Sequence, residues 1–464
     1  MSEVATKYLR MRTIRRPRLH WSYLFVLVLL ALRFVSAPTA TAAFFLLAAY
    51  AVMGRKQAIQ ALALSWLFSM LSPAIAPVVP QAALGRYAVL FSVALSVLLR
   101  VERGASGTGV PVKRMVLLTV LLGAGILAHA LMFSAVRDVS MLKAVSWMVA
   151  VASLLSAWSG LSAGDRTQLE YQLFSGLALL MLASLPLVFS GRGYLVNGTG
   201  FQGFLSHPQA FGSTMGLLAA WLGSRILGQA RPPWRLVVLF VMALLLIVLS
   251  EARTAGLGLM LGVLVAISVG RLLARRRLRD YLPGLRSRRV QLTVGLGLLV
   301  VIATGPLLGG KLATFVAKRG NSSNLVEAYD RSRGAKVDEM WSNIREHPLR
   351  GIGFGVASDP FSMEVARDPV LGLPIGASIE KGVVYLAVWE ELGLLGLLVV
   401  LGWLWLLVRR AALAGLTPLA VCLTALAMNF GEATLFSPSG MGMLTLVLLT
   451  WSATARRPKE GQRG

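Results

Sequence analysis

The sequence predicts an all-α, polytopic membrane protein with about 12 to 14 transmembrane helices and one large, partly helical periplasmic loop. Apolar residues make up 56% of the 464 residues and charged residues only 14%, against about 25% in typical soluble proteins. Apolar runs of about 20 residues, the length that crosses a bilayer, follow one another along the chain. Basic residues collect in every second connection between these runs.

Each apolar run is interpreted as one spanning helix. The run from Thr41 to Met53 is short, so a count of about 12 helices with a re-entrant or interfacial piece stays open. The runs divide the chain into a basic cytoplasmic tail (1–20), about 11 transmembrane helices (21–308), a large periplasmic loop (309–382), about three further helices (383–454) and a second basic cytoplasmic tail (455–464). The predicted helices begin near Trp21, Thr41, Gln57, Leu84, Met115, Leu142, Tyr171, Gln209, Leu236, Thr254, Val290, Val383, Ala411 and Pro438.

The basic residues decide the orientation of these helices. With the N-terminus in the cytoplasm, the basic segments Lys7–Arg18, Arg100–Arg114 and Arg271–Arg289 all lie on the cytoplasmic side, as the positive-inside rule requires. The C-terminal tail is then cytoplasmic as well. The formal charge of +26 is therefore explained by topology and by contact with the lipid bilayer, and no nucleic-acid partner is expected.

Two outward connections carry candidate ligand contacts. The segment Ser190–Pro208 contains five glycines and Arg192, and its final His207-Pro indicates a shaped loop. Further along, Arg253 follows Glu251 in a tight turn between two apolar helices. A guanidinium at the membrane boundary is well suited to bind a diphosphate. Turn structure and ion pairing are the alternative interpretations of these residues.

The segment from Arg331 to Gly355 is the most polar stretch of the long outward loop. Apolar residues recur in it at helical spacing and a proline follows, which predicts an amphipathic helix that ends just after His347. Alternate glycines then allow positive φ and the close approach of a bulky or anionic ligand. The apolar positions of the predicted helix are Val337, Met340, Trp341 and Ile344. The candidate substrate contacts are Arg331, Arg333, Arg350, Gly351, Gly353 and Gly355.

Polar residues inside membrane spans are costly and are therefore functional hypotheses. Glu390, His347 and His207 are the candidate catalytic groups, because a carboxylate or an imidazole can accept a proton from a hydroxyl group. A proton shared between Glu390 and Glu391, an ion pair, a helix cap and a proline turn are the alternatives. The polar residues near the predicted outer ends of spans are Arg33, Arg86, His129, Glu251, Arg253, Glu390, Glu391 and Glu432.

The sequence predicts no metal site and no cofactor. The four histidines are scattered, no Asp-x-Asp pair occurs, and the single cysteine, Cys422, lies inside an apolar run. A requirement for a divalent ion is neither indicated nor excluded by these residues.

Four motifs in the second half of the chain occur in a recognisable order. They are Gly203–Gln209 at the start of a span, Ser250–Thr254 at a helix boundary, Trp341 with His347-Pro-Leu and Gly351–Gly355 in the long loop, and Tyr385–Gly396 after it. In these motifs, over about Gly200 to Leu407, the chain resembles the O-antigen ligase and O-antigen or exopolysaccharide polymerase superfamily.

The resemblance implies a membrane glycosyltransferase of the bacterial inner (plasma) membrane. Its donor would be an undecaprenyl-diphosphate-linked glycan, transferred to a glycan acceptor at the periplasmic face without a nucleotide sugar. By resemblance Arg253 is the best match for a diphosphate contact, and the acceptor hydroxyl needs a base such as His347, His207 or a carboxylate. A polysaccharide co-polymerase or a flippase is a further partner that the resemblance allows.

The chain departs from the family's pattern at two informative positions. The place of a His-Asn-like pair, eleven residues before Gly393, is taken by Gly382 and Val383. An arginine before the His-Pro loop is also missing, and Arg192 is the substitute that we expect. We therefore predict a polymerase of undecaprenyl-diphosphate-linked repeat units that makes a surface or secreted polysaccharide. An O-antigen ligase acting on a lipid A-core or protein acceptor, and a transporter or flippase of lipid-linked glycans, are the alternatives.

Overall fold

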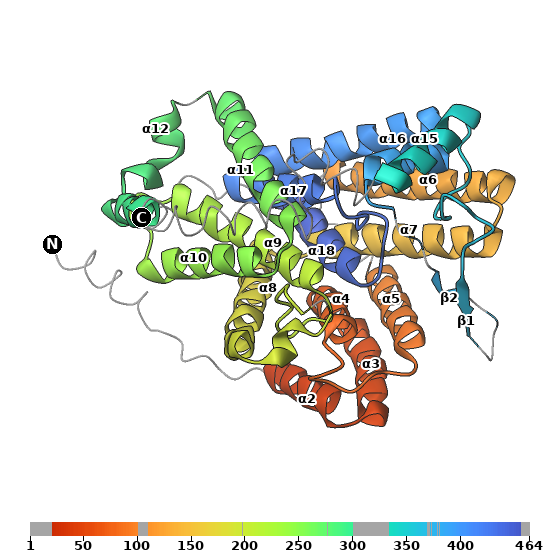
Figure 1. Ribbon diagram of the computed structural model, residues 1–464, viewed down its shortest axis with the longest axis horizontal. Coiled ribbons are helices and arrows are strands. Elements are labelled where there is room, and N and C mark those ends of the chain that lie inside the picture. The colour runs from red at the N-terminus through yellow and green to blue at the C-terminus, as the bar shows by residue number, and fades with distance from the viewer. Residues whose placement is uncertain are drawn as a thin grey trace.

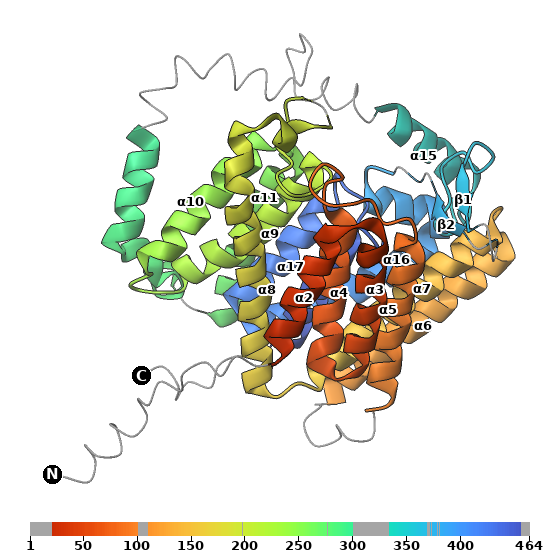
Figure 2. The same ribbon diagram turned by 90° about the horizontal axis from the view of Figure 1, so that it is seen from below.

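The computed structural model describes residues 21–100, 110–196, 198–275, 277–299, 334–368, 372, 374–377, 379 and 381–455. Within these residues the protein is a bundle of packed helices, with one small pair of strands at its margin (Figures 1 and 2). Five of the described helices are long and apolar enough to cross a membrane, and six further apolar helices are shorter. The predicted all-α polytopic fold is confirmed at this level.

The bundle helices follow the predicted apolar runs, but some of them begin or end at other residues because capping residues fix the helix ends. Thus α8 begins at Ala163 rather than near Tyr171, because Ser162 caps it by accepting a hydrogen bond from the Asp165 N–H at 3.1 Å. The helices are α2 (Trp21–Val35), α3 (Ala37–Val52), α4 (Arg55–Met70), α5 (Ala82–Leu98), α6 (Val110–Phe133), α7 (Arg137–Ser159), α8 (Ala163–Ser184), α9 (Pro208–Leu227), α10 (Trp234–Leu249), α11 (Arg253–Ala274), α16 (Val384–Ala414), α17 (Leu416–Met428) and α18 (Met441–Thr454), and another helix occupies 288–299.

Helices α2 and α3 form a tight hairpin around Ser36. The Ser36 side chain accepts a hydrogen bond from the Thr39 N–H, and the Thr39 side chain accepts one from the Ser36 N–H, so the pair forms a capping box. The ring of Phe25 stacks on that of Tyr50 at 5.3 Å between centroids, so the chain folds back on itself. The run predicted as short therefore starts earlier, at Ala37, and makes a 16-residue helix.

Connections between the helices gather at two ends of the bundle. At one, here named the outer end, Ser206 donates its N–H to the Met70 carbonyl at 2.7 Å and Phe201 donates to Leu249 at 3.0 Å. At the other, the inner end, the Arg166 guanidinium donates to the Thr454 carbonyl at 2.9 Å. Successive connections alternate between these ends, as spanning helices require.

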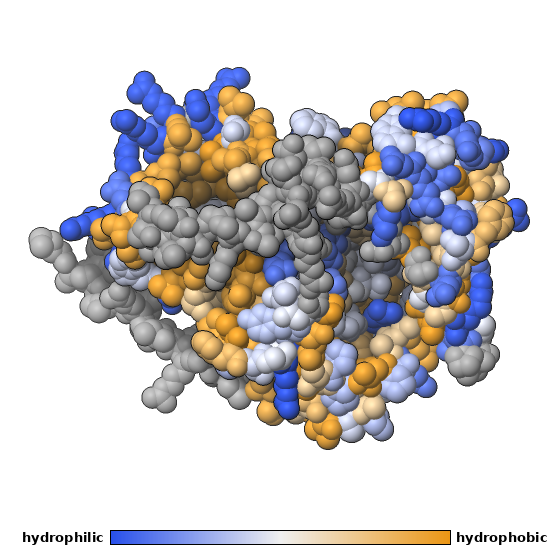
Figure 3. Space-filling model, viewed as in Figure 1, coloured by the Kyte–Doolittle hydropathy of each residue, from blue (hydrophilic) through white to orange (hydrophobic). Residues whose placement is uncertain are grey.

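The surface of the bundle is apolar along its helices. Leu264 of α11 and Leu398 of α16 are among the large exposed apolar side chains. Figure 3 shows apolar residues over α11 and polar residues gathered over α15 (Ala335–Glu346) at the opposite side of the view. This pattern fits helices that face lipid and a loop that faces water.

The described part of the long loop contains strands as well as the predicted helix. Strands β1 (Val365–Arg367) and β2 (Pro374–Ala377) pair antiparallel. The predicted helix is α15, which ends at Glu346 with His347 as its C-cap. The expectation of a helix that stops before Pro348 is confirmed. The predicted contacts Arg331 and Arg333 lie outside the described residues.

Candidate functional site

The site begins with a break in α16. Gly393 adopts φ +70° inside the helix, which interrupts the regular hydrogen bonding there. The Leu394 N–H donates to the Pro348 carbonyl at 2.9 Å instead of to its own helix. The carbonyls of Glu390 and Glu391, released by the break, accept hydrogen bonds from Ile352 and Gly353 at 2.9 and 3.0 Å. The break therefore binds residues 348–353 of the long loop to α16.

The three alternate glycines fit into this junction. Gly351, Gly353 and Gly355 all have positive φ, as the sequence predicts. A Cβ at Gly351 would lie 2.6 Å from the Glu390 carbonyl oxygen, and one at Gly353 would lie 2.6 Å from Ser134 Cα. The close approach that these glycines permit is thus to α16 and to the α6–α7 connection.

A buried charged cluster lies directly beneath the junction. Lys381 Nζ is 2.7 Å from Glu390 Oε2 and 3.2 Å from Glu391 Oε1, and all three side chains are at most 7% exposed. Asn343 of α15 donates to Glu390 Oε1 at 2.7 Å, and the Gly355 N–H donates to Glu391 Oε2 at 2.7 Å. Burying charges is costly, so these partners are needed to hold the two carboxylates in place.

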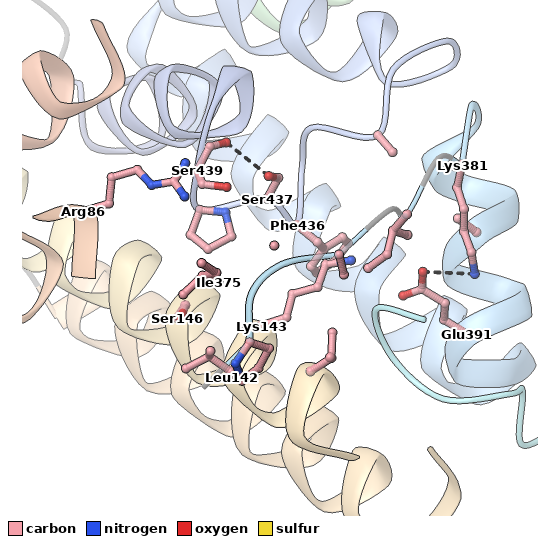
Figure 4. A pocket seen from close by; sticks show the side chains of 18 of the residues that line it. Arg86, Leu142, Lys143, Ser146, Ile375, Lys381, Glu391, Phe436, Ser437 and Ser439 are labelled. Carbon is pink, nitrogen blue, oxygen red and sulfur yellow. Dashed lines mark hydrogen bonds and ion pairs between the residues drawn. The ribbon is translucent and has the colours of Figure 1, made fainter. Parts of the chain in front are cut away.

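A cavity of about 250 Å³ opens beside this cluster at the outer end. Helices α5, α7 and α16, strand β2 and the segment 429–440 between α17 and α18 line it. Figure 4 shows Arg86 entering at one side of the cavity and Lys381 with Glu391 at the other. Together with Lys143, these are the charged side chains among its described lining residues.

Two of these cations, Arg86 and Lys143, form no hydrogen bond and no ion pair with any residue in the described part of the chain. The Lys143 ammonium lies 5.2 Å from the centre of the Phe354 ring, which places it next to the glycine run. Cations without an ion pair around a cavity are suited to an anionic ligand, which would supply the missing charge.

The predicted residues His347 and Arg350 lie near the junction but outside the cavity lining. Arg350 is exposed, and its Nη2 lies 3.3 Å from His347 Nδ1. The ring of His129 contacts the Arg350 carbonyl. Glu390 is fully buried, and both its carboxylate oxygens have partners in Asn343 and Lys381.

A second polar group lies on the other side of segment 429–440. His207 is the N-cap of α9 and accepts a hydrogen bond from the Gln209 N–H at 3.1 Å. The start of α9 packs on the start of α11, where a Cβ at Gly212 would lie 2.2 Å from that of Ala252, next to Arg253. Arg192 is exposed in the short helix η4 (Gly191–Tyr194). The predicted site residues thus fall into two groups rather than one.

Residues 238–401 match the family model described as O-antigen ligase. This match supports the resemblance to the O-antigen ligase and polymerase superfamily. The matched region contains Arg253, the glycine junction and both buried glutamates, whereas His207, Arg86 and Lys143 precede it. No curated protein matches the chain. The match supports a membrane glycosyltransferase of ligase or polymerase type with a lipid-linked glycan donor.

The cavity cations are the part of the site that sequence reasoning missed. Arg86 was identifiable only as one polar residue among several near the outer end of a span, and Lys143 only as a basic residue at a helix start. Lys381 is far from Arg86 and Lys143 in sequence, and it lines the same cavity only because α5, α7 and α16 pack together. The sequence signal that could have identified Arg86 and Lys143 is a basic residue inside an apolar run with no acidic residue three or four positions away to pair with it.

Proposed function

We propose that this protein is a polymerase that joins undecaprenyl-diphosphate-linked oligosaccharide repeat units at the outer end of the bundle. The orientation that we propose places this end at the periplasmic face of the bacterial inner membrane, with both termini in the cytoplasm. The absence of the His-Asn-like pair before Gly393 favours a polymerase over a ligase. No nucleic acid takes part.

The observation that carries this proposal is the pair of cations without an ion pair among the described residues, Arg86 and Lys143, in one cavity. A diphosphate diester has two negative charges, so two cations complement it. As the glycosidic bond to the diphosphate breaks, negative charge grows on the leaving oxygen, and fixed cations stabilise it more than the starting state. Pockets that bury a drug-sized ligand are about 300 to 1,000 Å³. The cavity of about 250 Å³ therefore fits the diphosphate and its attached sugar rather than a whole oligosaccharide.

The transfer step can be written with the residues of this cavity. The acceptor hydroxyl oxygen attacks the anomeric carbon of the donor, the bond from that carbon to the diphosphate oxygen breaks, and the diphosphate leaves with the electron pair. Glu391 takes the hydroxyl proton, because it lines the cavity while Lys381 and the Gly355 N–H hold its carboxylate in position. Inversion at the anomeric carbon is implied by the resemblance.

The other predicted bases have weaker support. Glu390 has no accessible oxygen, so we assign it to positioning Lys381 and Asn343. His347 lies at the end of α15, where its ring is held near Arg350. His207 belongs to the second polar group with Arg253. Both histidines would reach the acceptor hydroxyl only if the substrate extends beyond the cavity.

The resemblance assigns the diphosphate contact to Arg253 instead of to the cavity cations. In that arrangement Arg192 and Arg350 would be further glycan contacts. Arg331 and Arg333, which lie outside the described residues, stay predicted contacts. The two assignments differ in which cation substitution abolishes turnover. They can therefore be separated by kinetics.

The test uses the full-length protein in liposomes with a synthetic undecaprenyl-diphosphate-linked repeat unit as sole substrate, and products are followed by gel and mass spectrometry. We expect a ladder of longer lipid-linked products. Lys143→Ala and Arg86→Ala should each lower kcat/KM by at least about 100-fold, the effect of removing a transition-state charge contact. Lys56→Ala, which removes an inner-end lysine bonded to Gln168, is the matched control and should stay within about twofold of wild type.

Three results would contradict the assignment. Loss of the ladder in Arg253→Ala but not in Lys143→Ala would transfer the diphosphate contact to the second polar group. A repeat unit that is never extended but appears on an added lipid A-core acceptor would identify a ligase. A unit that crosses the bilayer unchanged would identify a transporter.

A further inference from the structure

Helix α15 carries an exposed tryptophan next to the charged cluster. The helix buries Met340 and Ile344, packs against α16, and leaves Trp341 38% exposed. The Trp341 ring packs in a T-shaped arrangement on Trp389 of α16, with 5.6 Å between centroids. Trp389 is two residues before Glu391, which lines the cavity. Residues two apart on a helix face nearly opposite sides, and Trp389 is not among the cavity-lining residues, so the tryptophan pair lies on another side of α16 at the same end of the bundle, with one ring open to the outside.

Polar side chains surround the exposed tryptophan. Asp338, Ser342 and Arg345 occupy the same side of α15 as Trp341, because they stand three or four residues apart or next to it, and the four line one surface depression. None of the three polar side chains forms a hydrogen bond or an ion pair with another described residue. A carboxylate, a hydroxyl and a guanidinium thus flank an aromatic ring, and none of the three has a hydrogen-bond partner among the described residues.

This set of groups is complementary to a sugar ring. A pyranose has a face of C–H groups that packs on the electron-rich face of an aromatic ring, and its rim of hydroxyls both donates and accepts hydrogen bonds. A carboxylate accepts such bonds and a guanidinium donates several in a plane. Binding sites for small molecules combine an apolar aromatic contact with a few placed polar groups in this way.

We propose that Asp338, Trp341, Ser342 and Arg345 form a glycan-binding surface, which holds the sugars of a substrate or product that extend beyond the cavity. The inference rests on the proposed function, since it assumes that the cavity holds a lipid-linked glycan. The cavity is too small for an oligosaccharide, so the outer sugars need a contact elsewhere. The α15 surface offers an exposed aromatic contact at the same end of the bundle, on a helix that contacts the charged cluster through Asn343.

An interfacial tryptophan that anchors the loop in lipid headgroups is the alternative occupant. The charge of α15 argues against it. Its 12 residues include three acids, Asp338, Glu339 and Glu346, against two bases, Lys336 and Arg345, so the helix lacks the excess of basic residues that binds anionic headgroups. A glycan without net charge needs no such excess, so the polar groups favour sugar over lipid.

The test is a binding measurement on the full-length protein in nanodiscs, labelled with 5-fluorotryptophan. The Trp341 resonance is identified by its absence in Trp341→Phe. The probes are the free repeat-unit oligosaccharide, released by mild acid from the lipid-linked donor, and its dimer and tetramer. We expect the tetramer to shift the Trp341 resonance in a saturable way. Trp341→Ala and Arg345→Ala should each weaken tetramer binding by about tenfold, as removal of a central contact does.

Trp405→Ala is the matched control, because Trp405 is exposed on α16 far along the helix from Glu391 and outside both the cavity and the glycan surface. It should leave the tetramer affinity unchanged. If the Trp341 resonance does not shift on addition of the tetramer but is broadened by lipids with paramagnetic headgroups, the proposal is overturned in favour of a lipid anchor. Because this titration needs no turnover, saturable binding without any polymer ladder would refute the proposed function alone. A ladder without tetramer binding would refute only the glycan surface.

Discussion

Substitution of Lys381 by methionine is expected to destabilise the outer end of α16. Methionine keeps the length of the side chain but removes its charge, so the carboxylates of Glu390 and Glu391 would be left side by side in a buried site. The Lys381 ammonium now lies 2.7 Å from one and 3.2 Å from the other. Removal of one partner from a buried ion pair costs about 3 to 5 kcal/mol, because the remaining charge stays buried without compensation.

A second substitution separates the loss of charge from the loss of packing. Glu390→Gln keeps the shape of the side chain and an oxygen that can still accept the hydrogen bond from Asn343. The double variant with Lys381→Met leaves only Glu391 charged, and this carboxylate still accepts the Gly355 N–H. We therefore expect the double variant to be more stable than Lys381→Met alone, with an interaction energy of about 2 kcal/mol in the double-mutant cycle.

The assay is thermal and denaturant unfolding of the purified protein in detergent, followed by size-exclusion fluorescence. Lys56→Met, at the inner end, is the control and should change the free energy of unfolding by less than about 0.5 kcal/mol. A Lys381→Met variant as stable as this control would refute the reasoning. So would two single effects that simply add in the double variant, because additivity means that Lys381 and Glu390 do not interact.

Two further predictions concern the helix break and the membrane orientation. Gly393→Ala would place a Cβ 1.9 Å from a backbone carbonyl oxygen at φ +70° and should lower the free energy of unfolding by about 2 kcal/mol or more. The control is Gly402→Ala in the same helix, whose Cβ would meet nothing within 4 Å, so this variant should be neutral or stabilising. Equal losses of stability in the two variants would exclude the helix break as the cause. In a Cys422→Ser background, a membrane-impermeant maleimide should label Ser362→Cys in intact spheroplasts and Ala230→Cys only after permeabilisation. The reverse labelling would invert the proposed topology.

The features that the sequence predicts well are local. Apolar runs and basic connections predict the helices and their alternation, because burial in lipid requires both. The end of α15 follows from Pro348, and the positive φ of Gly351 follows from the absence of a side chain. Met340 and Ile344 are buried as the amphipathic pattern predicts, whereas Trp341 lies at the rim of that face.

The features that the sequence could not predict depend on contacts between distant segments. Nothing near Gly393 distinguishes it from Gly396 or Gly402 in the same helix, since its positive φ is fixed by the hydrogen bonds that α16 exchanges with the long loop. The convergence of Arg86 and Lys143 depends likewise on how α5 packs on α7. Each cation alone has the ordinary explanation of a residue near the membrane boundary.

The segment 429–440 holds the two polar groups at a fixed separation. Asn429 Oδ1 accepts hydrogen bonds from the N–H groups of Thr434 and Leu435 at 3.0 and 2.9 Å, and the indole of Trp147 donates to the Leu435 carbonyl at 3.1 Å. One side of this segment lines the cation cavity, and on the other side Glu432 contacts Thr254 beside Arg253. Since these bonds fix the segment, the separation of the two groups is set before substrate binds. A preorganised separation is what charge stabilisation in the transition state requires, because a charge that must first move loses part of its effect.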